Sequence, residues 1–126
     1  MSAKEKAKRG AKGKWKKGGK GKRNEEMLLL AAKAGDLADV RRLLSEGASG
    51  DAKVGRVLHE KGGDLDDENK LDEAMAVYEE ALRIRRSALG PEAKEVGDTL
   101  NNMGVVLEKQ GKLDEAMARY EEALGI

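Results

Sequence analysis

One segment that occurs twice constrains this chain more than any other feature of its sequence. Residues 70–84 read KLDEAMAVYEEALRI and residues 112–126 read KLDEAMARYEEALGI, so 13 of the 15 positions are identical at an offset of 42. A repeat period of roughly 40 residues is typical of solenoids, in which each repeat buries its apolar face against its neighbours. Apolar residues recur at helical spacing in both copies. The predicted fold is therefore all-α, a short helical-repeat solenoid of antiparallel helix pairs.

The segments that precede the two copies also match. Residues 55–62 read GRVLHEKG and align with residues 104–111, GVVLEKQG, at an offset of 49. Because this offset is larger than 42, the first repeat is predicted to carry an acidic insertion at residues 63–69, in the turn between its helices. The two repeats then span residues 51–89 and 91–126, with helices at about 51–61, 70–88, 92–110 and 113–124.

The acidic insertion has some likeness to a calcium-binding loop. An EF-hand loop that starts at Asp64 requires glycine at its sixth position and glutamate at its twelfth. Asn69 and Met75 occupy those positions. A solvated turn is therefore expected here, and no metal site.

The spacing of small and large residues within each repeat resembles that of tetratricopeptide repeats, in the 42-residue variety of kinesin light chains. Residues 100–104, LNNMG, also have the form of the L-N-N-L-A segment of that family. Glycine inside a helix costs about 1 kcal/mol relative to alanine, which close contact between paired helices would explain. The resemblance implies that the following residues pack the repeats: Gly55, Leu58, Ala74, Tyr78, Ala81, Leu100, Gly104, Leu107, Ala116, Tyr120 and Ala123.

The same resemblance implies a binding groove on the concave face, lined by the first helix of each repeat. In the second repeat the groove residues would be Asn101, Asn102, Val105, Glu108 and Lys109. Asparagine offers donors and acceptors that suit the backbone of an extended peptide. Hydrogen bonding of the two asparagines between adjacent repeats is an equally good interpretation. The predicted function is a non-enzymatic scaffold that binds a protein or peptide, in the manner of a kinesin-light-chain adaptor.

Residues 24–48 predict two further helices, at about 25–34 and 37–46, with Asn24 and Asp36 as N-caps. This hairpin resembles an ankyrin repeat, although the T-P-L-H turn of that family is missing. A generic helical hairpin that caps the solenoid remains the alternative. The residues that carry the resemblance are Ala31, Ala32, Gly35, Leu37, Val40, Leu43, Leu44, Gly47 and Ala48.

Residues 1–23 form a basic arm with a net charge of +10, whereas residues 24–126 carry a net charge of −9. Lysine, glycine and alanine dominate the arm, so it is expected to be disordered. It could bind nucleic acid or another polyanion, which makes a nucleic-acid- or ribosome-associated factor the alternative function. It could equally be a solubilising tail. The residues proposed for binding are Lys12, Lys14, Trp15, Lys16, Lys17, Lys20, Lys22 and Arg23.

Composition argues against several other classes. The chain has no cysteine and one histidine, and no nucleophile–base pair or metal-ligand cluster can be assembled from it, so neither an enzyme nor a cofactor is expected. No apolar run approaches the roughly 20 residues of a membrane span. A cytoplasmic location is expected, and the clustered lysines could also direct nuclear import.

The last predicted helix has an apolar face that is only partly covered, which indicates self-association or a fragment of a longer array. The residues of this apolar face are Leu113, Met117, Tyr120 and Leu124.

Overall fold

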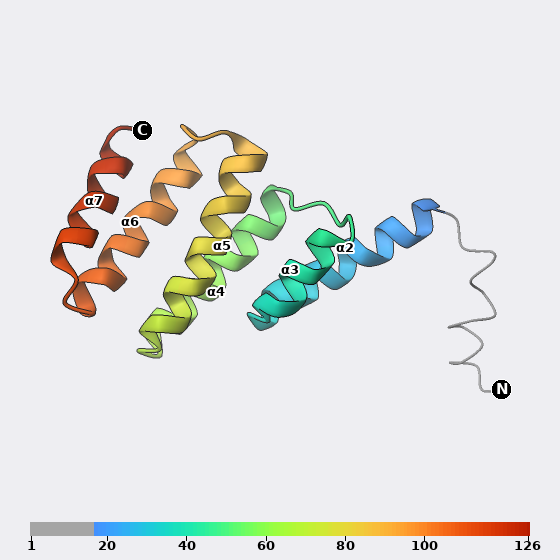
Figure 1. The fold of residues 1–126 in the computed structure, drawn as a ribbon, viewed down its shortest axis with the longest axis horizontal. Coiled ribbons are helices and arrows are strands. Elements are labelled where there is room, and N and C mark those ends of the chain that lie inside the picture. Colours follow the sequence, from blue (N-terminus) through green and yellow to red (C-terminus); the bar gives the residue numbers. More distant parts are fainter. Residues whose placement is uncertain (1–16) are drawn as a thin grey trace.

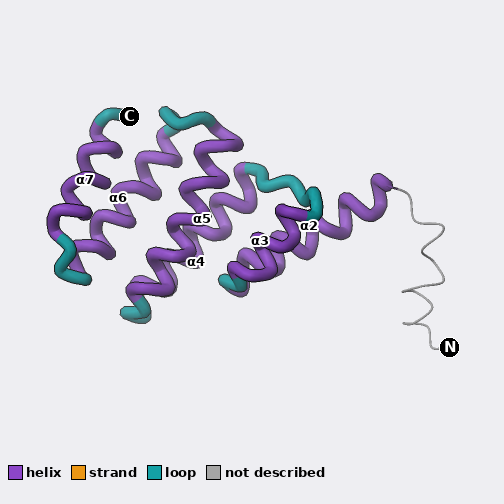
Figure 2. The backbone as a smooth tube through the Cα atoms, in the orientation of Figure 1, coloured by secondary structure: helices purple, strands orange, loops and turns teal. Residues whose placement is uncertain are grey.

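The computed structural model describes residues 17–126, which form a row of α-helices joined by short turns (Figure 1 and Figure 2). The helices pair in chain order and lie side by side, from the first pair near one end of the row to the last pair at the other. Within the described residues there is no strand. The helices are α2 (Lys17–Ala34), α3 (Leu37–Ser45), α4 (Ala52–Asp67), α5 (Leu71–Leu89), α6 (Lys94–Lys109) and α7 (Leu113–Leu124).

One apolar core runs through the whole row. Each helix places the side chains of its apolar stripe between itself and its neighbours, so the core passes from α2 and α3 through α4 and α5 to α6. This continuity is what allows a chain with no phenylalanine to bury large side chains. The largest fully buried residues are Tyr78, Leu28, Leu43, Leu58, Leu100 and Met103. No helix between residues 17 and 126 is long and apolar enough to cross a bilayer.

The first helix begins earlier than predicted. α2 starts at Lys17, so residues 17–23 of the basic arm are helical, and the prediction of disorder is wrong for them. Asn24, the predicted N-cap, lies inside the helix. Each residue added to the helix that contains Leu28 gains one backbone hydrogen bond, which here acts against the low helix propensity of Gly18, Gly19 and Gly21. Residues 1–16 lie outside the described part of the chain.

The predicted insertion at residues 63–69 is wrong. α4 continues to Asp67, so most of the acidic segment forms the last turns of the helix and only residues 68–70 form the turn to α5. The expected solvated loop is therefore a helix end. Asp51, predicted as the first helical residue, is the N-cap of α4 and accepts a hydrogen bond from the backbone N–H of Val54 at 3.1 Å.

The turns inside the two repeats match each other at the offset of 42. Lys70 N–H donates to the carbonyl of Leu65 at 2.8 Å, and Lys112 N–H donates to the carbonyl of Leu107 at 2.8 Å. Asn69 has a φ of 61°, and Gly111, its counterpart in the second repeat, has a φ of 80°. Asparagine tolerates this left-handed conformation better than most residues with a side chain, so it replaces the glycine of the second turn without any change in length.

The hairpin of α2 and α3 is joined to the first repeat by packing and by a buried carboxylate. α2 packs on α4, and Glu80 of α5, which is 5% exposed, accepts a hydrogen bond from Arg41 of α3 at 3.2 Å. Arg83 is a second partner of the same carboxylate. Asp36 caps α3 as predicted, accepting from the N–H of Asp39 at 3.1 Å. The start of α6 differs from the prediction, because residues 91–93 form a turn and the helix begins at Lys94.

Candidate functional site

The first helices of the two repeats, α4 and α6, present a polar surface that we call the α4–α6 face. Its residues occupy positions that match at the offset seen in the turns. α4 and α6 are in direct contact, so their polar side chains form one surface. The α4–α6 face comprises Arg56, His59, Glu60, Gly63, Asp66 and Asp67 of α4 and Asp98, Asn101, Asn102, Val105, Glu108 and Lys109 of α6.

Polar contacts hold the two helices of this face in register. Lys109 Nζ donates to Asp66 Oδ1 at 2.8 Å, which connects the C-terminal ends of α6 and α4. Nearby, Gln110 Nε2 donates to Asp72 of α5 at 2.7 Å. These contacts cross from one repeat to the next, so they stabilise the relative placement of the repeats and keep part of the face occupied by internal bonds.

A cluster of hydrogen-bonded polar side chains connects the two repeats, and it includes His59 and Asn102 of the face itself. The amide nitrogen of Asn102 lies 3.2 Å from Nε2 of His59 and donates to the hydroxyl of Tyr78 at 3.4 Å. Nδ1 of His59 lies 3.0 Å from Oγ1 of Thr99, which also accepts from Arg85 at 3.2 Å. Since the amide of Asn102 donates to Nε2, the neutral ring carries its proton on Nδ1 and donates it to Thr99. The cluster gives hydrogen-bond partners to His59, Thr99 and Asn102 where repeat packing has removed them from water, whereas Nε of Arg85 is buried without a hydrogen-bond partner among residues 17–126.

The structure separates the predicted groove residues into two groups. Asn102 and Lys109 bond across the repeats, and Glu108 accepts from the hydroxyl of Tyr120 at 2.5 Å, which raises the pKa of Tyr120 to about 12. The side chains of Asn101 and Val105 are exposed and make no hydrogen bond or ion pair within the described residues. For Asn102 the interpretation as an inter-repeat hydrogen bond therefore describes the geometry, while Asn101 is open to a ligand.

The predicted packing residues lie between the helices, with a difference between the repeats. Most are buried, and Gly55 and Gly104 face α5 and α7 so closely that an added Cβ would contact Arg85 at 2.8 Å and Tyr120 at 2.5 Å. Tyr120 and Ala123 are only half-buried, because no described element covers that side of α7. The buried residues are Gly55, Leu58, Ala74, Tyr78, Ala81, Leu100, Gly104, Leu107 and Ala116.

Sequence reasoning missed the residues that α4 contributes to the face. The sequence alignment paired Gly55 with Gly104, which put the residues of α4 in the wrong register. In the structure the counterpart of Gly104 is Gly62, because each of these glycines contacts the tyrosine of its own repeat. A signal was present, because Val54 and Gly55 recur as Val96 and Gly97 at the offset of 42. The missed residues are Arg56, Glu60, Asp66 and Asp67.

The α4–α6 face is acidic. Its carboxylates are those of Glu60, Asp66, Asp67, Asp98 and Glu108, and its cations are Arg56 and Lys109, which gives a net charge of −3. Two of the five carboxylates bond a cation of the face itself, Glu60 with Arg56 at 3.5 Å and Asp66 with Lys109 at 2.8 Å. The exposed remainder favours a ligand that carries positive charge.

Most of the basic arm lies outside the residues that the structure describes. Lys12, Lys14, Trp15 and Lys16 lie outside the described residues, and the backbone of Lys17, Lys20 and Lys22 lies in the first turns of α2. Arg23 is exposed on α2. Between residues 17 and 126, no group of three or more histidine, cysteine or acidic side chains is arranged to hold a metal ion.

Comparison with known proteins identifies the architecture. A family model described as tetratricopeptide repeat matches residues 53–126, which is more than half of the chain and includes both repeats. The chain belongs to the tetratricopeptide repeat family. Such repeats generally mediate contacts between proteins, which supports a scaffold role for helices α4 to α7. A comparison with curated proteins finds no match.

The histidine between the two tetratricopeptide repeats makes stability depend on pH. Burial, followed by the charge of Arg85, lowers the pKa of His59 from its ordinary value of 6.5. The unfolded chain therefore binds a proton at a pH where the folded chain does not. Stability should be full above pH 6.5 and should fall as the pH drops through that value, levelling off below the lowered pKa of the folded state.

This dependence can be measured by urea denaturation between about pH 7.5 and pH 5.5, a range above the titration of ordinary carboxylates. The denaturation midpoint of the natural chain should decrease across the range. His59→Gln removes the only histidine of the sequence and should make the midpoint nearly constant. An equal decrease in both proteins would show that another group titrates.

Proposed function

We propose that this chain is a non-enzymatic scaffold that binds a basic, extended segment of a partner protein across the α4–α6 face. The observation that carries the proposal is the acidic, two-helix surface formed by matching positions of the repeats, with exposed Glu60, Asp67 and Asn101 along it. A carboxylate-rich surface attracts lysine- and arginine-containing segments and speeds their association. The resemblance to kinesin light chains suggests adaptor work in the cytoplasm, in which the bound segment belongs to a cargo protein.

Peptide selection is the direct test of this proposal. Random peptides of about 12 residues, long enough to cross two helices, are displayed and selected on the full chain. We expect the enriched peptides to carry net positive charge, and binding to weaken as salt is added because exposed charges are screened. Selection of neutral or acidic peptides would contradict the proposed ligand class.

Charge reversal locates the binding surface. The double variant Glu60→Lys/Asp67→Lys changes two exposed carboxylates of the face and should weaken the selected peptides by about tenfold or more. The matched control is Glu79→Lys/Glu121→Lys, which makes the same change of charge at exposed positions of α5 and α7. Equal weakening by both pairs would indicate attraction to the total charge of the chain, and no specific face.

The basic arm offers an alternative function, binding of nucleic acid or ribosomes, which the charge asymmetry of the sequence favours. Lys12, Lys14, Lys16 and Lys17 are changed together to glutamine in the full chain. Binding of partners through the α4–α6 face should persist after both this change and nuclease treatment. Loss of all partners under either treatment would assign the main function to the arm.

A further inference from the structure

A small cationic cavity, which we call the Arg85 cavity, lies at one end of the repeats. It is lined by residues from the start of α4, the end of α5 and the start of α6, and its volume is about 270 Å³. Three of the lining residues are cations and one is a carboxylate, so its net charge is +2, whereas residues 24–126 together carry −9. The lining residues are Ala52, Lys53, Arg56, Arg85, Leu89 and Glu95.

The cavity contains a buried guanidinium without a counter-ion. Arg85 is 5% exposed, and its Nη1 donates to two neutral oxygens, the carbonyl of Glu95 at 3.0 Å and Oγ1 of Thr99 at 3.2 Å. Nε is buried, and neither Nε nor Nη2 has a hydrogen-bond partner among residues 17–126. Buried charges in proteins are normally paired. An arginine in this state therefore points to an anionic ligand.

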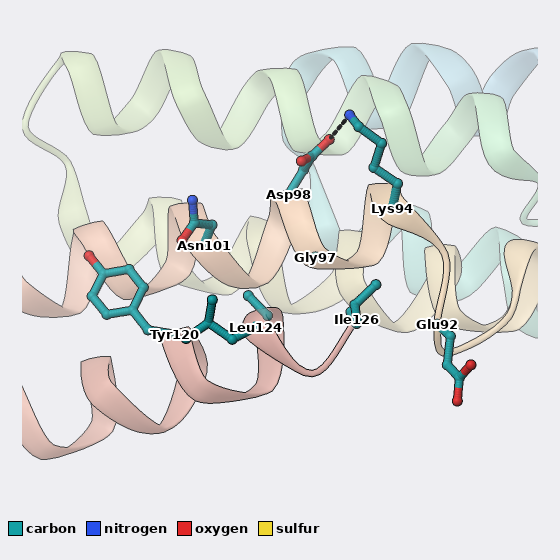
Figure 3. Close-up of a pocket in the computed structure, with 9 residues that line it drawn as sticks. Glu92, Lys94, Gly97, Asp98, Asn101, Tyr120, Leu124 and Ile126 are labelled. Carbon is teal, nitrogen blue, oxygen red and sulfur yellow. Dashed lines mark hydrogen bonds and ion pairs between the residues drawn. The ribbon is translucent and has the colours of Figure 1, made fainter.

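The carboxylates around Arg85 do not act as its counter-ion. Burial lowers the pKa of Arg85, and the charges of Glu95 and Asp98 offset only part of this effect. Asp98 bonds Nζ of Lys94 at 3.5 Å (Figure 3). Asp51 accepts from the backbone of α4 as its N-cap. Within the described residues, no carboxylate forms an ion pair with Arg85.

The other two cations of the cavity are available to a ligand. Lys53 is exposed and makes no hydrogen bond or ion pair within the described part of the chain. Arg56 pairs with Glu60 at 3.5 Å, but both side chains are exposed, and such surface pairs contribute little. Ala52, the first residue of α4, also lines the cavity, so the positive end of the helix dipole lies there. Because Arg56 belongs to the α4–α6 face as well, the cavity adjoins that face.

We propose that the Arg85 cavity binds the phosphate group of a phosphorylated serine or threonine in the partner segment that lies on the α4–α6 face. A phosphate ester carries a charge near −2 and three acceptor oxygens, which match the net charge and the three cations of the cavity. The cavity is smaller than the roughly 300–1,000 Å³ of sites that enclose a whole small molecule, and none of its lining residues is aromatic. It therefore suits a single phosphate group better than a nucleotide. Only the attachment of the phosphate to this segment rests on the proposed function.

Inorganic phosphate tests the cavity without any peptide. It is titrated into the full chain at constant ionic strength, and the Nε–H signal of Arg85 is followed by nitrogen-15 nuclear magnetic resonance. The signal is assigned by its loss in Arg85→Lys. We expect a saturable shift with phosphate and a much smaller one with acetate. An Arg85 signal that does not respond to phosphate, or that responds equally to acetate, would overturn the proposal.

Exposed variants assign the binding without disturbing the buried arginine. Lys53→Gln/Arg56→Gln should weaken phosphate by about tenfold or more, since it removes two charged donors. Glu95→Gln removes the only carboxylate that lines the cavity and should strengthen binding about two- to fivefold. The matched control, Lys33→Gln/Lys112→Gln, changes exposed lysines elsewhere and should have no effect. Equal weakening by both pairs would show attraction to the overall charge, contrary to the proposal.

A phosphopeptide tests what carries the phosphate. Phosphoserine is placed at each position in turn of a peptide selected on the α4–α6 face. At one position it should strengthen binding to the natural chain about tenfold, and this gain should vanish in Lys53→Gln/Arg56→Gln. Glu60→Lys/Asp67→Lys should weaken the unphosphorylated peptide but leave inorganic phosphate bound. A peptide that binds the face and gains nothing from phosphoserine at any position would refute the phosphorylated segment while the proposed function stands.

Discussion

Tyr78→Ala is expected to lower the free energy of unfolding by about 3–5 kcal/mol, the range found when a fully buried aromatic side chain is truncated. Tyr78 is 1% exposed. The centroid of its ring lies 5.6 Å from that of His59, in the same repeat. Its hydroxyl accepts from Asn102 at 3.4 Å. Truncation would leave a cavity where the first repeat meets the second. Urea denaturation followed by far-ultraviolet circular dichroism measures the loss.

Tyr120→Ala is the matched control, because Tyr120 occupies the same position in the second repeat but is only half-buried. It should lower the free energy of unfolding by less, about 2–3 kcal/mol, in proportion to the smaller area removed from contact. Tyr78→Phe keeps the ring and should cost about 1 kcal/mol through the lost hydrogen bond. Equal losses for the two alanine variants would contradict the burial difference between the repeats.

Gly62→Ala is expected to destabilise the chain by about 1–3 kcal/mol, the usual result of adding a methyl group to a filled core. The new Cβ would lie 2.6, 2.7 and 2.9 Å from three ring atoms of Tyr78. Because the ring is enclosed on all sides, it cannot move away without displacing its neighbours. The clash outweighs the gain of about 1 kcal/mol that alanine has over glycine in a helix.

Gly104→Ala tests the same contact where the tyrosine can move. Its Cβ would lie 2.5 Å from Cε1 of Tyr120, but Tyr120 is only half-buried and its ring can shift toward solvent. We expect the free energy of unfolding to change by less than about 1 kcal/mol, because the helix gain offsets the displaced ring. The thermal denaturation midpoints of the two variants provide the measurement. A Gly62→Ala protein as stable as the natural chain would show that the helices can separate without loss.

The second helix of each repeat could be predicted closely from the sequence. The expected helix at 113–124 is observed as α7 at Leu113–Leu124, and that at 70–88 is observed as α5 at Leu71–Leu89. Both contain a nearly unbroken apolar stripe and no competing turn signal. Gly35 and Asp36 likewise ended α2 and began α3 as expected, since these preferences act within a few residues of the chain.

The candidate site was predicted only in part. Asn101 and Val105 are exposed on α6, and their role in a groove stays a prediction, but the residues of α4 on the same face were not found. The alignment of α4 with α6 depends on which glycine of α4 contacts the tyrosine of its repeat. The residues around Gly55 and those around Gly62 both resemble the residues around Gly104. Only the packed helices distinguish them, because Gly62 faces Tyr78 and Gly55 faces Arg85.

Three features could be deduced without the structure, because they follow from composition and local periodicity: the all-α fold, the repeated helices within residues 70–84 and 112–126, and the opposite charges of the arm and the body. Two other features became visible only in the packed helices: the length of α4 and the acidity of the α4–α6 face. Each depends on contacts between residues of different helices. Such contacts exist only once the helices are packed, so no local pattern reveals them.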